Sequence, residues 1–323
     1  MSLLGGAAAS VAAPPAVRAQ QPALPVLGFL SSLSPQALAK PLLAFRQGLS
    51  ETGHDDGRNI AIEYRWADGQ YARLPELASQ LVRLNPSVIV TVGGDFAALA
   101  AKAATPTIPI VFMVGNDPVK TGLVRSFNRP EGNATGMHLF ITNLEAKRVG
   151  LLHQLVAPAA TLAMFINPKL ETAEAQASDI IAAAQALGRK FEIVNCSDEM
   201  EIQRGFENSK RKNVGAILIS ADPFFISRTS LIVLLAAQHT IPVMYPTREC
   251  VDAGGLMSYG TSFPDAYRQV GIYAGRILNR EPPASLPILQ PTEFEFVINL
   301  KTAKALGVTI PPTLLALADE VIE

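Results

Sequence analysis

The sequence predicts an α/β fold of two similar lobes, each built on a parallel β-sheet. Residues 88–92 and 110–114 are continuous apolar runs rich in β-branched side chains, which is typical of strands buried on both faces. The Ala-rich segment 96–104 between them favours a helix, so the three segments form one strand–helix–strand unit. A second unit of the same kind follows at 214–245, and a chain of 323 residues has room for two lobes.

A short internal echo accompanies the two units. The hexapeptide TIPIVF at 107–112 is similar to TIPVMY at 240–245, and both lie where the second strand of a unit is expected. One explanation of the echo is chance, since the match is short. The other is that the chain forms two similar lobes. Ligands of open α/β sheets bind outside the carboxyl ends of the strands, so the polar loops of both lobes would then face a shared cleft.

The remaining elements follow from apolar patterning and from helix start and stop signals. Ser34 is a good N-cap and Pro35 suits the first turn, so a helix is expected from there to about Gly53. Alternating apolar side chains predict a strand at 59–66 near a sheet edge. Further strands are expected at 26–30, 135–140, 161–166, 191–195, 256–259 and 292–299. Further helices are expected at 74–84, 123–127, 144–156, 171–187, 197–210, 224–239, 247–251, 262–278, 301–306 and 313–321.

The composition favours a folded chain with a large core and gives no sign of a nucleic-acid partner. Apolar residues make up 49%, and the formal net charge is −1 with no basic block that would contact phosphates. No run is long and apolar enough to span a bilayer. The two cysteines, Cys196 and Cys250, form no CxxC pair and are too few for a metal site, so buried free thiols are expected rather than a disulfide.

The first twenty residues differ from the rest of the chain. Residues 1–20 are rich in Ala, Gly and Pro, contain no acidic residue, and end in a Val-Arg-Ala-Gln stretch that resembles a signal-peptidase site. The basic segment that normally opens a secretory signal is missing. The segment is therefore interpreted as the remnant of a signal peptide, and the alternative is an unstructured Ala-rich terminus.

Two strand-end loops are candidates for anion binding. Helices are expected to begin just after Ser31-Ser32 and just after Gly93-Gly94, and unpaired N–H groups at helix starts favour a ligand carboxylate. Glycine allows close approach to the chain, and the serine hydroxyls add donors. Asp95 ends the second loop and is a further candidate ligand-binding residue. The alternative is that these residues form ordinary caps and a tight turn.

Other candidates supply acceptors and stacking surfaces. Asn116, Asp117 and Asp222 follow strands and would accept hydrogen bonds from a ligand ammonium or hydroxyl group, although an Asp before proline also commonly caps its own turn. Phe224 and Tyr245 would stack on a planar or apolar ligand, with burial in the core as the alternative.

Four motifs together resemble a known family. They are DPV at 117–119, GNATG at 132–136, GGLMSYG at 254–260 and NLKTAKALG at 299–307. From about residue 25 to 323, the chain resembles the bacterial ABC-transporter substrate-binding proteins of the tryptophan/tyrosine-binding type. Two departures stand out: the basic start of the signal is missing, and Glu131 stands where members often have glycine.

The resemblance implies a type I periplasmic-binding-protein fold, with two Rossmann-like lobes with parallel sheets joined by three hinge crossovers. Lobe 1 is expected to comprise 24–138 plus 261–291, and lobe 2 to comprise 139–260 plus 292–323. The ligand would lie in the cleft between the lobes. The resemblance also implies a monomeric, exported periplasmic protein that delivers its ligand to ABC permease and ATPase subunits at the membrane.

The function expected is therefore capture of a small carboxylate, an amino acid or an aromatic acid, by hinge closure, with no cofactor and no metal. An enzyme acting in the same cleft is the first alternative, but the chain has no GxSxG, P-loop, HExxH or GxGxxG motif. A ligand-sensing regulator is the second alternative. It would need a DNA-binding segment, and the first twenty-five residues cannot form a helix-turn-helix.

Overall fold

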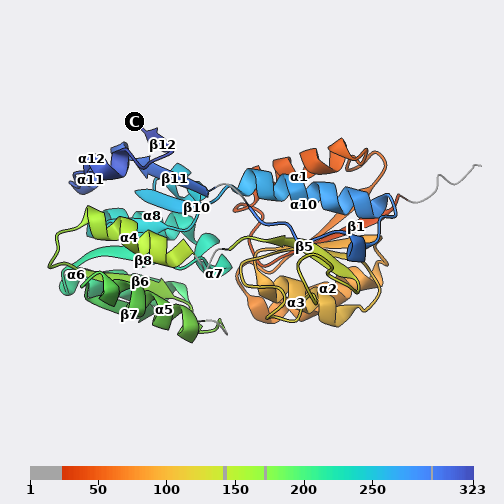
Figure 1. The fold of residues 1–323 in the computed structure, drawn as a ribbon, viewed down its shortest axis with the longest axis horizontal. Coiled ribbons are helices and arrows are strands. Elements are labelled where there is room, and N and C mark those ends of the chain that lie inside the picture. Colours follow the sequence, from red (N-terminus) through yellow and green to blue (C-terminus); the bar gives the residue numbers. More distant parts are fainter. Residues whose placement is uncertain (1–23, 141–143, 171–172, 292–293) are drawn as a thin grey trace, which may run out of the picture.

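The computed structural model describes residues 24–140, 144–170, 173–291 and 294–323, and it shows two α/β halves side by side (Figure 1). The expected signal-peptide remnant at 1–20 lies outside these residues. The chain passes between the halves three times (Figure 1): after the fifth strand, after the tenth, and before the eleventh. This arrangement matches the two-lobed α/β fold that the sequence predicts.

The first half contains a five-stranded sheet in which every pair of neighbouring strands is parallel. Its order is β2-β1-β3-β4-β5. The strands are β1 (Val26–Ser31), β2 (Ala61–Trp66), β3 (Val88–Val92), β4 (Ile110–Val114) and β5 (Ala134–His138). The helices are α1 (Ala39–Glu51), η1 (Tyr71–Arg73), α2 (Leu74–Arg83), α3 (Asp95–Ala104) and, from much later in the chain, α10 (Phe263–Leu278) and η3 (Pro283–Ser285).

Helices cover both faces of this sheet. Figure 1 shows α1 and α10 on one face and α2 and α3 on the other. Phe29, Phe45 and Tyr267 are buried in the core under α1 and α10. Leu81 and Phe112 are buried in the core under α2 and α3. Burial on both faces explains why β3 and β4 are apolar without alternation.

The return of α10 to the first half depends on glycines at its contact with α1. A Cβ atom on Gly48 would collide with the carbonyl oxygen of Arg268, and one on Gly271 would collide with that of Phe45. The two helices can therefore approach backbone to backbone only because these positions lack side chains. This close packing fixes where the first turns of α10 lie.

The second half contains a seven-stranded sheet in the order β12-β11-β10-β9-β8-β6-β7. Its neighbours are parallel except for β10 and β11, which are antiparallel. The strands are β6 (Thr161–Ile166), β7 (Phe191–Asn195), β8 (Val214–Ile219), β9 (Val243–Tyr245), β10 (Met257–Thr261), β11 (Phe294–Asn299) and β12 (Glu320–Ile322). The helices are α4 (Glu145–Leu155), α5 (Ala173–Ala186), α6 (Glu199–Arg211), α7 (Pro223–Ile226), α8 (Thr229–His239), α9 (Arg248–Asp252), α11 (Leu300–Leu306) and α12 (Pro312–Leu315).

The two sheets share one arrangement of their first four strands. The order β2-β1-β3-β4 in the first sheet corresponds to β7-β6-β8-β9 in the second. The echoed hexapeptides at 107–112 and 240–245 lead into β4 and β9, which occupy equivalent places. The echo thus reflects the repeated architecture.

Four expectations about local structure are wrong. The helix expected to begin at Ser34 and Pro35 begins only at Ala39, with Leu38 at its N-cap position. The end of the chain is not one helix over 313–321, because α12 stops at Leu315 and β12 then pairs with β11. Residues 123–127 form no helix; the N–H groups of Leu123 and Val124 bond back to the carbonyl of Pro118. The helix expected over 224–239 is divided into α7 and α8. In each case contacts with neighbouring segments outweigh local propensity.

No helix within the described ranges has the length and apolar character that a membrane span requires. Cys196 and Cys250 are both buried and both free, as expected.

Candidate functional site

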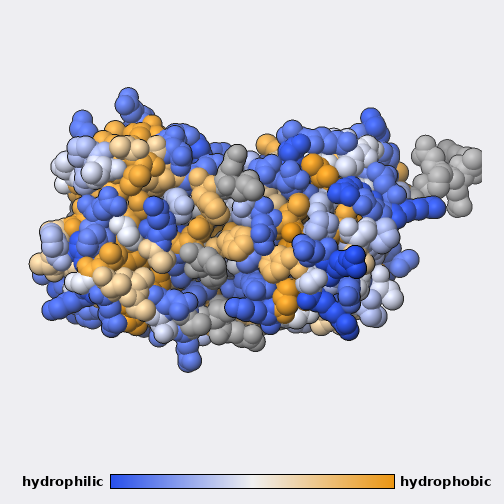
Figure 2. All heavy atoms as spheres, viewed as in Figure 1, coloured by the Kyte–Doolittle hydropathy of each residue, from blue (hydrophilic) through white to orange (hydrophobic). Residues whose placement is uncertain are grey.

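A cavity lies between the two halves, at the carboxyl ends of the strands of both sheets. It contains about 660 Å³ of empty space, part of which is open solvent. Figure 2 shows apolar residues gathered along the seam between the halves on this face. The first half contributes Leu33, Gly93, Gly94, Asp95, Phe96, Met113, Gly115, Asn116, Leu139, Phe263 and Tyr267; the second contributes Leu170, Gln176, Ala221, Pro223 and Ile226.

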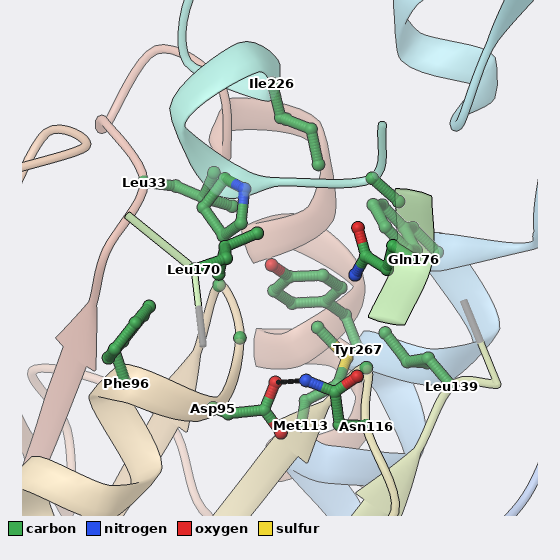
Figure 3. Close-up of a pocket in the computed structure, with 16 residues that line it drawn as sticks. Leu33, Asp95, Phe96, Met113, Asn116, Leu139, Leu170, Gln176, Ile226 and Tyr267 are labelled. Atoms are coloured by element: carbon green, nitrogen blue, oxygen red, sulfur yellow. Dashed lines mark hydrogen bonds between the residues drawn. The ribbon is translucent and has the colours of Figure 1, made fainter. Parts of the chain in front are cut away.

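Asp95 and Asn116 form the polar end of the cavity. The Asn116 Nδ2 donates a 2.9 Å hydrogen bond to Asp95 Oδ2, and Figure 3 shows the two side chains next to each other beneath the ring of Tyr267. Asp95 Oδ1 is buried and accepts no hydrogen bond from the described residues. Burial raises the pKa of Asp95 to about 6, against the opposing effect of hydrogen bonds from the backbone of Asp95 and Asn116 and from the Asn116 amide. The carboxylate therefore retains acceptor capacity in a poorly solvated place.

The loop before Asp95 brings backbone into the cavity. Gly93 and Gly94 have φ angles of +82° and +102°, a region that residues with side chains rarely adopt. Gly94 is also the N-cap position of α3, so that helix begins beside the cavity. Both glycines line the space, as the sequence predicts for a loop that lets a ligand approach the backbone.

Tyr267 lines the cavity from α10. It lies in the second turn of α10, its side chain is fully buried, and its hydroxyl group has no hydrogen-bond partner among the described residues. Figure 3 shows the amide of Gln176, from α5 in the second half, on the other side of the Tyr267 ring from Asp95 and Asn116. The cavity thus offers polar groups at separated points on otherwise apolar walls.

The walls are formed by large apolar side chains from both halves. Leu33, Leu170 and Ile226 lie around the ring of Tyr267 in Figure 3, while Phe96 lies at one side near Asp95. The Phe96 ring also stacks on Tyr71, with 4.7 Å between the ring centroids. Aliphatic and aromatic walls favour a ligand with an apolar or aromatic body.

Polar contacts between described residues join the halves across the cleft. The Tyr71 hydroxyl donates to Asp222 Oδ1 and accepts a 3.1 Å hydrogen bond from the Phe224 backbone N–H. On another part of the cleft, Lys40 Nζ lies 3.0 Å from Asp252 Oδ2. The halves are therefore held face to face around the cavity.

The structure brings together Gly93, Gly94, Asp95 and Asn116 of the candidates from the sequence. Ser31 and Ser32 are fully buried behind this loop and do not line the cavity. Ser31 Oγ accepts a 3.0 Å hydrogen bond from the Leu33 N–H, and Ser32 Oγ donates to the Gly93 carbonyl. These two serines support the residues that face the cavity.

The remaining candidates lie outside the lining. Asp117 Oδ1 accepts a 2.8 Å hydrogen bond from the Val119 N–H, and Asp222 Oδ1 accepts one of 2.6 Å from the Phe224 N–H, so both cap turns. Phe224 lines a neighbouring cavity at the mouth of the cleft. Tyr245 is 1% exposed in the core of the second half and borders a small separate cavity under α8.

Sequence reasoning missed the residues that other elements bring to the cavity. Phe263 and Tyr267 arrive on α10, far along the chain from the loops they meet. The available signal was the start of a helix just after a strand end, at Ser262-Phe263-Pro264. Leu139, Leu170, Gln176 and Ile226 carried no signal, because apolar or amide side chains in loops and helix starts are common.

Comparisons with known proteins agree with this architecture. A family model described as "ABC transporter substrate binding protein" matches residues 27–322. A protein named "Tyrosine-binding protein", from Clostridioides difficile (strain R20291), is 24% identical over 282 residues, covering 87% of this chain and 80% of the relative.

Two solved structures have a similar fold. A conserved domain protein from Vibrio cholerae matches with a TM-score of 0.82 and 26% identity, covering 92% of this chain and 99% of that one. A structure described as an ABC domain in complex with L-Trp, from Streptococcus pneumonia, matches with a TM-score of 0.81 and 24% identity, covering 93% and 100% of the two chains.

Proposed function

The chain belongs to the family of ABC transporter substrate-binding proteins, and we propose that it captures an amino acid with an aromatic or large apolar side chain in the cavity between its halves. The observation that carries this proposal is the cavity itself. It lies at the carboxyl ends of both sheets, has aliphatic and aromatic walls, and has the Asp95–Asn116 pair at one end. An amino acid with an apolar side chain matches both the walls and the polar end.

Relatives support the ligand class. One curated relative is named a tyrosine-binding protein, and one structure with the same fold is described as a complex with L-Trp. Tyrosine and tryptophan each combine a ring with a charged amino-acid group. The aromatic acids that the sequence also suggested share the ring, but they lack the ammonium group that would neutralise Asp95.

Capture would proceed by hinge closure. Residues 24–138 plus 261–291 would move as one lobe and 139–260 plus 292–323 as the other, around the three passages of the chain between them. Tyr71 with Asp222 and Lys40 with Asp252 meet only when the lobes face each other, so these contacts would stabilise the closed form. Closure would enclose the ligand and shape a surface for a transporter.

The partners follow from the family. A membrane permease and its ATPase would receive the ligand, and the protein would act outside the cytoplasm as a monomeric carrier that performs no reaction on its cargo. The family is one of solute-binding proteins rather than enzymes. An enzyme in the same cleft remains the alternative, and recovery of a chemically altered ligand would favour it.

A thermal-shift screen of the twenty amino acids tests the ligand class. A ligand at a hundredfold excess over its Kd adds about 2.7 kcal/mol to the free energy of unfolding, which raises Tm by about 5 °C for a chain of this size. Tryptophan, tyrosine or phenylalanine should give the largest shifts, and aspartate and lysine should give none. Shifts confined to charged or small polar amino acids would contradict the proposal.

A further inference from the structure

We propose that the charged group this cavity recognises is the ligand's ammonium group, with Asp95 as its acceptor, so that the ligand class extends to aromatic amines without a carboxylate. This inference rests on the proposed function and specifies which part of the ligand carries the recognition.

The described residues that line the cavity include one carboxylate and no cationic side chain. Among the described lining residues, Asp95 is charged at neutral pH, and none is Lys, Arg or His. These described lining residues would not neutralise an incoming ligand carboxylate.

The nearest cations already have partners or lie outside the cavity. Arg228 and Lys169 border the neighbouring cavity at the mouth of the cleft. The Arg228 guanidinium lies 4.3 Å from the centroid of the Phe224 ring, its Nη1 donates to the Phe224 carbonyl at 3.2 Å, and its Nε lies 3.3 Å from Glu199. Lys169 has an exposed side chain. Asp95 therefore has no cationic partner within the described part of the protein.

The free acceptor capacity of Asp95 is matched to an ammonium group. A carboxylate can accept about four hydrogen bonds, and Asn116 Nδ2 supplies one to Oδ2, while Oδ1 accepts none from the described residues. Burial raises the pKa of Asp95 although the backbone N–H groups of Asp95 and Asn116 and the Asn116 amide favour its charged form. The charge of the carboxylate is therefore only partly compensated by the described residues. A cationic ligand would compensate it, and an anionic ligand would add a second negative charge.

A ligand carboxylate would meet only neutral donors. Those on the described lining are the backbone at the start of α3, the Asn116 amide and the Tyr267 hydroxyl. These groups can hydrogen-bond a carboxylate, but they hold no full positive charge. The carboxylate of an amino acid should therefore add less to affinity than its ammonium group.

The contributions of the ammonium group and the carboxylate can be measured separately with ligand triads, each consisting of an amino acid, the matching amine and the matching acid. Calorimetric titrations at pH 8 would compare phenylalanine with phenethylamine and 3-phenylpropionate, tyrosine with tyramine and 3-(4-hydroxyphenyl)propionate, and tryptophan with tryptamine and indole-3-propionate. For the amino acid that binds best, the amine should bind within about tenfold of it, and the acid should bind at least about a hundredfold more weakly.

Two outcomes overturn the inference and leave the proposed function standing: the acid binds as well as the amino acid, or amine and acid both bind a hundredfold more weakly. If no amino acid, amine or acid binds, both the inference and the proposed ligand class fail. The triads thus distinguish the two failures.

The variant Asp95→Asn tests the role of the carboxylate directly, since it keeps the shape and removes the charge. It should weaken the amino acid and the amine at least thirtyfold and leave the acid unchanged or tighter. Equal weakening of all three would indicate a merely structural role and overturn the inference. Glu76→Gln is the matched control, because Glu76 is also an acidic residue in the first turn of a helix of the first half but is exposed away from the cavity.

Discussion

The hydroxyl group of Tyr71 in the first half donates a hydrogen bond to the carboxylate of Asp222 in the second half. Tyr71 lies in η1, after β2, and Asp222 follows β8 and caps α7. The ring of Tyr71 is also stacked on Phe96, which lines the cavity. One side chain therefore connects the wall of the cavity with the contact that holds the halves together.

Tyr71→Phe should weaken ligand binding without unfolding the protein. The substitution keeps the ring on Phe96 and removes a hydrogen bond that exists only between facing halves, which destabilises the closed form by about 1.5 kcal/mol. The apparent Kd should rise about tenfold, because the ligand binds the closed form. X-ray scattering should also show a larger radius of gyration in the ligand-free variant.

Tyr64→Phe is the control for this loss of a hydroxyl group. Tyr64 accepts a 3.1 Å hydrogen bond from Arg46 within the first half, away from the cleft. It should leave both Kd and radius of gyration unchanged. If both tyrosine variants behave alike, the Tyr71–Asp222 contact does not govern closure.

Ligand affinity should depend on pH through Asp95. Its pKa of about 6 in the folded protein lies above its ordinary value of 3.8, so the protonated form dominates below pH 6 and cannot pair with an ammonium group. Affinity for an aromatic amino acid should be constant above pH 7 and fall about tenfold per pH unit below pH 6. Calorimetry from pH 5 to 8 measures this, and Asp95→Asn should abolish the slope.

In the ligand-free protein, the pH dependence of stability that Asp95 causes should have the opposite sign. Because the folded-state pKa is raised, the contribution of Asp95 to stability is fully present below pH 4 and is lost as pH rises through 6. Relative to Asp95→Asn, the ligand-free protein should therefore lose Tm between pH 4 and 6. An identical pH dependence of Tm in both proteins would show that Asp95 is not perturbed.

Gly271→Ala should destabilise the first half strongly. The new methyl group would collide with the Phe45 carbonyl, and backbone cannot move aside as a flexible side chain can. Overpacking of this kind costs about 1–3 kcal/mol, and displacement of α10 would also move Tyr267 and Phe263 in the cavity. Denaturant unfolding should show a lower midpoint, and ligand affinity should fall with it.

Gly150→Ala provides the matched comparison. Gly150 lies inside α4, and a Cβ atom there would contact no other atom within 4 Å. Since alanine favours a helix over glycine, this variant should be unchanged or more stable by up to about 1 kcal/mol. Equal destabilisation by both substitutions would mean that the α1–α10 contact is not the cause.

Glu131→Gly should stabilise the protein slightly. Glu131 has a φ of +57°, which costs a residue with a side chain about 1 kcal/mol, and it is one of the places where this chain departs from the family it resembles. Its ion pair with Arg125, 3.4 Å long and exposed, adds little. The Tm should rise by about 1–2 °C. Glu131→Ala removes the same ion pair but keeps the strain, so it should not raise Tm.

The sequence predicted the features that depend only on residues close together in the chain. Buried parallel strands appear as apolar runs, and the loops after them are polar, so this pattern alone places Gly93, Gly94, Asp95 and Asn116 at strand ends. The direction of a side chain on such a strand could not be predicted. Tyr245 belongs to a strand buried on both faces, where no alternation distinguishes the cleft from the core.

The parts that the sequence did not reveal depend on distant contacts. Tyr267 reaches the cavity only because α10 returns to the first half and packs on α1, a placement that its own apolar face does not specify. β12 forms because the edge of β11 is available, and the Phe296 N–H bonds to Asp319 just before it at 2.8 Å. A short segment such as 320–322 carries too little pattern to identify that partner.

The cavity between the halves is proposed to hold an aromatic amino acid and to release it unchanged. Calorimetric titration of the protein and of Ala221→Phe, which fills the cavity with a larger side chain, tests it most directly. We predict one bound tryptophan, tyrosine or phenylalanine per chain, recovered intact, and no binding to Ala221→Phe. Equal binding by the filled variant, or no saturable binding of any of the three, would contradict the claim.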